Sequence, residues 1–133
     1  MAFVLDASVA VAWVVPSQAN EYARRVRVRA KREPFHVPAV FPAEVTNVIV
    51  TLERRSILSA QGAAAAAGIL SRLEPIIHAL GLSVAEMRQL ANRFELSAYD
   101  AAYLALALDL HLAVACGDRP LKRALSRVGV KLA

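Results

Sequence analysis

Four acidic side chains stand out in this sequence because each lies where a strand is expected to end or a helix to begin. They are Asp6, directly after FVL, Glu44, within VPAVFPAEVTNVIV, Asp100, within SAYDAAYLALAL, and Asp118, two residues after LAVAC. Four carboxylates brought together would repel one another and take up protons unless a cation sat among them. Clustered carboxylate oxygens suit a hard cation such as Mg²⁺ or Mn²⁺. These residues therefore predict a site for one or two such ions.

Each acid also fits a purely structural role at the start of a helix. Ser97 and Asp100 have the spacing of a capping box, and the same spacing recurs at Ser83 and Glu86, where capping explains it fully. Asp118 fits as the cap of a helix that follows it. Taken singly, each acid is better explained by capping than by catalysis, so the metal site depends on the acids lying together.

The elements that would position these residues alternate between strands and helices. Segments rich in Val, Ile and Leu predict strands at Ala2–Leu5, Phe35–Val37, Pro75–Leu80, Leu112–Cys116 and Val128–Leu132. Helices are predicted at Val9–Val15, Gln18–Lys31, Pro42–Arg55, Ala60–Leu73, Val84–Phe94, Ala98–Leu110 and Pro120–Arg127. This alternation indicates an α/β fold with a parallel central sheet of about five strands flanked by helices. A length of 133 residues predicts a single domain, 1–133.

In such a sheet, ligands bind beyond the carboxyl ends of the strands. Asp6 and Asp118 follow strands, whereas Glu44 and Asp100 lie in the first turns of helices, whose amino ends face the same edge. We therefore expect all four carboxylates to point into one crevice.

Two neutral residues are candidates to support the acids. Ser8, two residues after Asp6, is placed to orient a carboxylate or a metal-bound water, or equally to cap the helix that follows. Asn47, one turn after Glu44, shares a polar helix stripe with it. That stripe is equally well explained as ordinary surface.

The composition restricts the partners and the compartment. The net charge is +5, and thirteen of the sixteen basic residues are Arg, which matches phosphate in a bidentate way. The densest cluster, ARRVRVRAKR, reads either as a solvated helix face or as a contact for a polyanion. No apolar segment is long enough to span a bilayer, no signal peptide is evident, and a single cysteine permits no internal disulfide. A cytoplasmic protein is therefore expected.

The motifs together resemble the PIN-domain ribonucleases, and among these the VapC-type toxins of toxin–antitoxin pairs. The resemblance is carried by FVLDASVAVAW, VPAVFPAEVTNVIV, LSAYDAAYLALAL and LAVACGDRPLKRAL, in this order along nearly the whole chain. It implies a three-layer PIN-like fold whose acidic metal site falls on Asp6, Glu44, Asp100 and Asp118, supported by Ser8 and Asn47. One residue departs from the pattern, because Cys116 stands where these proteins usually carry Thr or Ser. A thiol donates more weakly than a hydroxyl, so we expect this change to tune the support of Asp118.

The leading hypothesis is a Mg²⁺- or Mn²⁺-dependent endoribonuclease in which water attacks the RNA phosphodiester. The residues expected to hold the RNA backbone are Arg54, Arg55, Arg119 and Lys122. The resemblance also implies a cognate antitoxin protein and a homodimer. An acidic amphipathic segment could dock on the apolar segment Val9–Val15 beside the arginine-rich helix, unless that segment is core. Two alternatives remain open: a non-catalytic RNA- or protein-binding module, and a phosphotransferase that forms an aspartyl-phosphate on Asp6.

Overall fold

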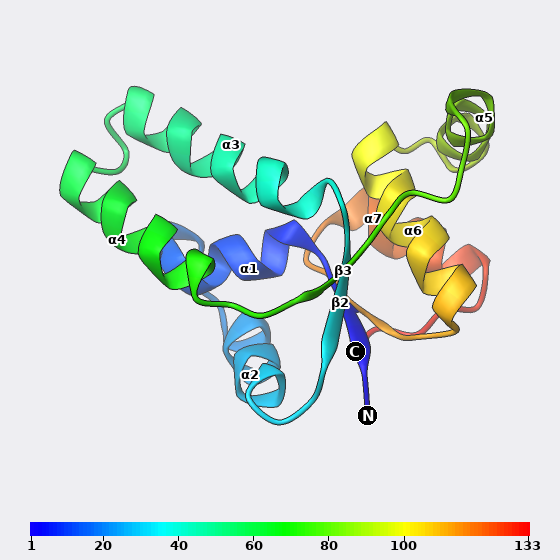
Figure 1. Cartoon of the computed structure of the whole chain (residues 1–133), viewed down its shortest axis with the longest axis horizontal. Coiled ribbons are helices and arrows are strands. Elements are labelled where there is room, and N and C mark those ends of the chain that lie inside the picture. The colour runs from blue at the N-terminus through cyan, green and yellow to red at the C-terminus, as the bar shows by residue number, and fades with distance from the viewer.

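The computed structural model describes all 133 residues and shows a parallel four-stranded sheet between two layers of helices (Figure 1). The strands are β1 (Phe3–Leu5), β2 (Phe35–Pro38), β3 (Ile76–His78) and β4 (Val114–Ala115), and they lie in the order β3-β2-β1-β4. The helices are α1 (Ala7–Val14), α2 (Glu21–Ala30), α3 (Phe41–Arg54), α4 (Ala60–Ser71), α5 (Val84–Phe94), α6 (Ala98–Leu110) and α7 (Arg119–Arg127), with a 3₁₀ turn at Pro16–Gln18. The predicted three-layer α/β fold with a parallel sheet is confirmed.

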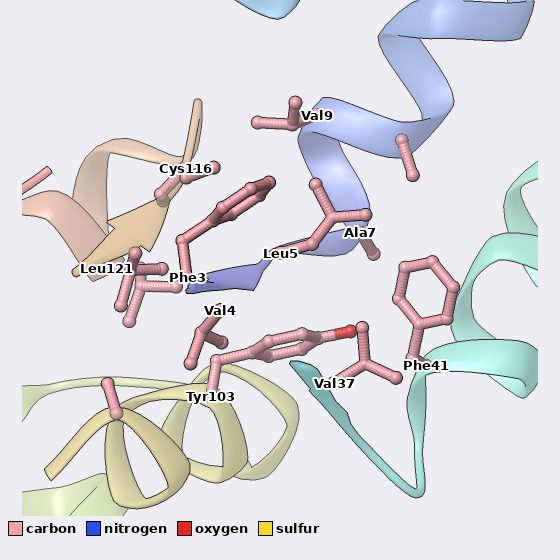
Figure 2. Packing of buried hydrophobic residues seen from close by; sticks show 14 of the residues in the cluster. Phe3, Val4, Leu5, Ala7, Val9, Val37, Phe41, Tyr103, Cys116 and Leu121 are labelled. Carbon is pink, nitrogen blue, oxygen red and sulfur yellow. The ribbon is translucent and has the colours of Figure 1, made fainter. Parts of the chain in front are cut away.

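Helices α1 to α4 lie on one side of the sheet, and α5, α6 and α7 lie on the other (Figure 1). The central strand β1 is completely buried, because it has a strand on each side and helices on both faces. Phe3 of β1 pairs with Phe35 of β2, and Leu5 pairs with Ala115 of β4. Figure 2 shows Val4 on the face covered by α6, where the ring of Tyr103 packs against it.

The predicted fifth strand at Val128–Leu132 is wrong. Only Leu132 makes an isolated parallel bridge, to Val114 of β4. Gly129 adopts φ +73° directly after α7, and the N–H of Val130 turns back to the carbonyl of Leu125 at 2.9 Å. This C-terminal turn of the helix leaves too few extended residues for a strand, so the sheet has four strands rather than about five.

The apolar segment that follows β1 is part of the core. Val9 and Val11 of α1 are buried, and the half-buried Trp13 donates its indole N–H to the carbonyl of Ala23 in α2 at 2.6 Å. Helix α2 begins later than predicted, because Asn20 caps it by accepting from the N–H of Ala23 at 2.8 Å. Val9–Val15 is therefore core rather than an open docking wall. None of the helices combines the length and apolar character that crossing a membrane requires.

Candidate active site

Asp6 occupies the turn between β1 and α1 and is the only charged residue among the buried ones, with 3% of its surface exposed. Its backbone N–H donates to the carbonyl of Ala115 in β4 at 2.9 Å, so the sheet itself holds this residue in place. Its carboxylate caps α1 by accepting from the N–H of Ser8 at 3.2 Å. Burial raises the pKa of Asp6, and the bonds from Ser8 counter part of that rise.

Ser8 links the two strand ends that carry aspartates. Its hydroxyl donates to Asp6 Oδ2 at 2.5 Å and accepts from the N–H of Gly117 at 3.0 Å. Gly117 immediately precedes Asp118, so this one side chain couples the turn after β1 to the turn after β4. The prediction that Ser8 orients a carboxylate agrees with this geometry, and its backbone N–H serves the cap as well.

Ser8→Ala is expected to weaken Mn²⁺ binding by about tenfold, because outer hydrogen bonds of this kind orient metal ligands. Isothermal titration with MnCl₂ measures this change. Ser126→Ala, an exposed serine on α7, is the matched control and should bind Mn²⁺ as the wild type does. Wild-type affinity in Ser8→Ala would show that the hydroxyl plays no part in binding the metal.

Glu44 lies in the first turn of α3, which begins with Phe41 and Pro42. It is half-buried, and its Oε1 atom is fully buried without a hydrogen-bond partner. Burial raises the pKa of Glu44, and the nearby hydroxyl of Tyr103 opposes that rise without forming a well-oriented hydrogen bond. Asn47, the predicted support for Glu44, is exposed on the same helix.

The two Ser-x-x-acid motifs, at the starts of α5 and α6, form different hydrogen bonds. In α5, Ser83 and Glu86 form both bonds of a capping box, at 2.9 and 3.2 Å. In α6, the Ser97 hydroxyl accepts from the N–H of Asp100 at 3.1 Å, but the Asp100 carboxylate does not return a bond to Ser97. Capping therefore explains Glu86 fully, as predicted, whereas the Asp100 carboxylate remains free to face the other acids.

Asp118 caps α7 by accepting from the N–H of Leu121 at 3.0 Å. Cys116, the predicted support for Asp118, touches its backbone rather than its carboxylate. The Cys116 sulfur accepts from the N–H of Asp118 at 3.3 Å and donates to its carbonyl at 3.4 Å. Burial raises the pKa of the Cys116 thiol, so it stays protonated and holds the turn in shape.

Three of the four carboxylates have raised pKa values, and the charge of Asp118 contributes to each rise. The pKa of Asp100 is raised to about 7, first by burial, then by a hydrogen-bonding contact with Asp118 and by the charges of Asp118, Asp6 and Glu44. The charge of Asp118 also raises the pKa of Asp6, and both of these aspartates act on Glu44. Asp6 and Asp118 each cap the helix that follows a strand, and Glu44 and Asp100 lie in the first turns of α3 and α6.

These residues fit a hard divalent cation. The donors are all carboxylate oxygens, and the buried Glu44 Oε1 lacks any other partner. The side chains as placed do not bring three or more such donors together around one point. Carboxylates that raise one another's pKa values gain most from such a cation.

The four residues predicted to hold RNA are split between two places. Arg119 is exposed at the first position of α7, next to Asp118, and Lys122 lies one turn later with its ammonium 6.0 Å from the ring of Tyr22. Arg54 and Arg55 are exposed at the far end of α3, about 16 Å along the helix from Glu44. Arg119 and Lys122 therefore border the acids, whereas the other pair would reach only an extended substrate.

Tyr103 lies at the site although it is not among the residues predicted from the sequence. It is three residues after Asp100 on α6, so the two side chains share one helix face. The three-residue spacing from Asp100 was the signal in the sequence that could have identified Tyr103. A tyrosine inside an apolar helix, however, more often packs in the core.

Comparisons with known proteins agree with this fold. The model of the PIN domain family matches residues 3–125. The crystal structure of PAE2754 from Pyrobaculum aerophilum is similar with a TM-score of 0.67 at 19% identity, covering 97% of this chain and 90% of that one. VapBC2 from Rickettsia felis, solved bound to a DNA fragment from its promoter, is similar with a TM-score of 0.65 at 13% identity, covering 100% and 98%. No curated protein matches the sequence. Because the family model spans nearly the whole chain, the chain belongs to the PIN domain family.

Proposed function

We propose that this protein is a Mg²⁺- or Mn²⁺-dependent endoribonuclease that acts as the toxin of a toxin–antitoxin pair. PIN domains are generally nucleases, which supports the hydrolytic part of the proposal. The observation that supports it is electrostatic: the charges of Asp118, Asp6 and Glu44 all raise the pKa of Asp100, as expected for acids that lie near one another.

In this proposal the four carboxylates hold the cation directly or through water. When bound, the ion lowers the pKa of a water molecule and stabilises charge on the phosphate. Ser8 fixes the orientation of Asp6, and Arg119 and Lys122 hold the phosphates that flank the scissile bond. Because water rather than a ribose hydroxyl attacks, the products carry a 5′-phosphate and a 3′-hydroxyl.

Cleavage of end-labelled RNA by the purified protein tests the proposal. Cleavage is expected with Mg²⁺ or Mn²⁺ and should stop when EDTA is added. An RNA with a single 2′-deoxynucleotide at the mapped cleavage position should still be cut, since the ribose hydroxyl takes no part in the attack. Cleavage that persists in EDTA, or that the 2′-deoxy substitution blocks, would contradict the metal mechanism. RNA that binds without turnover would instead favour a non-catalytic binding module.

We further propose a cognate antitoxin and a homodimer. The similar structure named VapBC2 supports a partner protein for this chain. Since α1 is core, the exposed arginines of α2, such as Arg24 and Arg25, are the surface that would meet an acidic antitoxin segment. Light scattering with and without the antitoxin encoded beside this gene would measure both associations.

A further inference from the structure

Tyr103 is completely buried, with 0% of its surface exposed, yet it carries a polar atom into the core. Figure 2 shows its ring extending from α6 beneath β1, with the hydroxyl beside Val37 and directed toward Phe41 at the start of α3. Glu44 is in the first turn of that helix. The hydroxyl is therefore directed toward the helix start that carries Glu44.

The Tyr103 hydroxyl and Glu44 Oε1 are the two buried side-chain polar atoms that lack a hydrogen-bond partner. The two groups are close enough that the Glu44 charge, after burial, contributes to raising the pKa of Tyr103. A phenol keeps its proton under these conditions, so the hydroxyl is a donor, and an ionised carboxylate is an acceptor. The Tyr103 hydroxyl can therefore supply the donor that Glu44 Oε1 lacks, and Glu44 can supply the acceptor that the hydroxyl lacks.

A phenylalanine at this position would fill the same space without an unpaired hydroxyl. Leaving a buried hydroxyl unpaired destabilises a fold, and such groups in native proteins call for an explanation. Asp100 lies three residues before Tyr103, so one face of α6 presents both an acid of the site and a hydroxyl beside a second acid.

We propose that Tyr103 is a positioning residue whose hydroxyl donates to the ionised Glu44 carboxylate and holds it where it contacts the cation. A charge-assisted bond of this kind is stronger than one between neutral groups, and the buried surroundings strengthen it further. This inference rests on the proposed metal site, and its test separates the two.

The first measurement is the Mn²⁺ dissociation constant at pH 8, determined by calorimetry for the wild type, Tyr103→Phe, Glu44→Met and the double variant. Tyr103→Phe is expected to raise the dissociation constant about tenfold, and to change it no further in the Glu44→Met background. A constant within about twofold of wild type, or equal weakening in both backgrounds, would overturn the proposal. Tyr99→Phe is the matched control, because Tyr99 is on the same helix and 58% exposed; it should leave the constant unchanged.

The second measurement needs no metal and compares melting temperatures of the same four proteins at pH 8. Tyr103→Phe should lower Tm when Glu44 is present, because a hydrogen bond is lost. It should raise Tm in the Glu44→Met background, because an unpaired hydroxyl is removed. A change of the same sign in both backgrounds would overturn the proposal. If the wild type binds no Mn²⁺, the proposed function fails, and this second measurement still decides whether Tyr103 holds Glu44.

Discussion

Asp6→Asn and Asp100→Asn are each expected to slow RNA cleavage by about 100-fold or more. Each change removes one negative charge from the group that would hold the cation and leaves the shape of the side chain intact. The rate of product formation from end-labelled RNA at saturating Mg²⁺ measures the effect.

The fold should tolerate both substitutions. Asparagine at position 6 can still accept from Ser8 and cap α1, and it removes a buried charge that burial disfavours. At position 100 the cap of α6 uses the backbone N–H of Asp100, which the substitution does not touch. Lost activity with an unchanged or higher Tm would therefore indicate a catalytic role.

Asp109→Asn is the matched control for Asp100→Asn, because Asp109 is exposed on the same helix. It should cleave RNA at the wild-type rate. Undiminished cleavage by both Asp6→Asn and Asp100→Asn would rule out the acidic site as the catalytic centre, whatever the control shows.

The second large effect is a fall in the stability of the metal-free protein as the pH rises from about 4 to about 7. The pKa of Asp100 is about 7 in the folded protein, against an ordinary value of 3.8. Between these values the folded state binds more protons than the unfolded state, so stability decreases with rising pH. A series of thermal melts in EDTA measures the slope, which should amount to a few degrees in Tm.

Mn²⁺ and Asp100→Asn should both reduce that slope, for different reasons. The cation replaces the proton as the positive charge among the carboxylates, so its stabilising effect is expected to be greatest above pH 7. Asp100→Asn removes the titrating group, and the variant should melt above the wild type at pH 8 in EDTA. Asp109→Asn should retain the wild-type slope. If Asp100→Asn leaves the dependence of Tm on pH unchanged, that dependence comes from another titrating group.

The limits of two helices were predicted correctly because the signals that set them are local. The helices at Val84–Phe94 and Ala98–Leu110 have the predicted limits, and a serine hydroxyl caps each one at its first turn. Strands depend on partners that sequence does not specify, which is why the strand expected at Val128–Leu132 is wrong. Apolar residues alternate with other residues in that segment, as in an edge strand. The turn at Gly129, however, leaves only Leu132 bridged to the sheet.

The acids could be named from sequence, but their convergence could not be established there. Two Ser-x-x-acid motifs look alike in sequence, and the structure shows that Glu86 closes its capping box whereas Asp100 does not. The same holds for Tyr103, whose place inside an apolar helix predicts core and whose hydroxyl is nevertheless buried without a hydrogen-bond partner.

The sequence by itself determined the residue types, the caps and the alternation of strands and helices, because these depend on neighbours a few positions away. Tertiary structure decided which acids affect one another's pKa values. The strand order β3-β2-β1-β4 places Asp6 between the turns that carry Glu44 and Asp118, and α6 adds Asp100 from the other layer. Electrostatic interactions between the carboxylates weaken steeply with distance, so the pKa of Asp100 is raised only when the chain is folded.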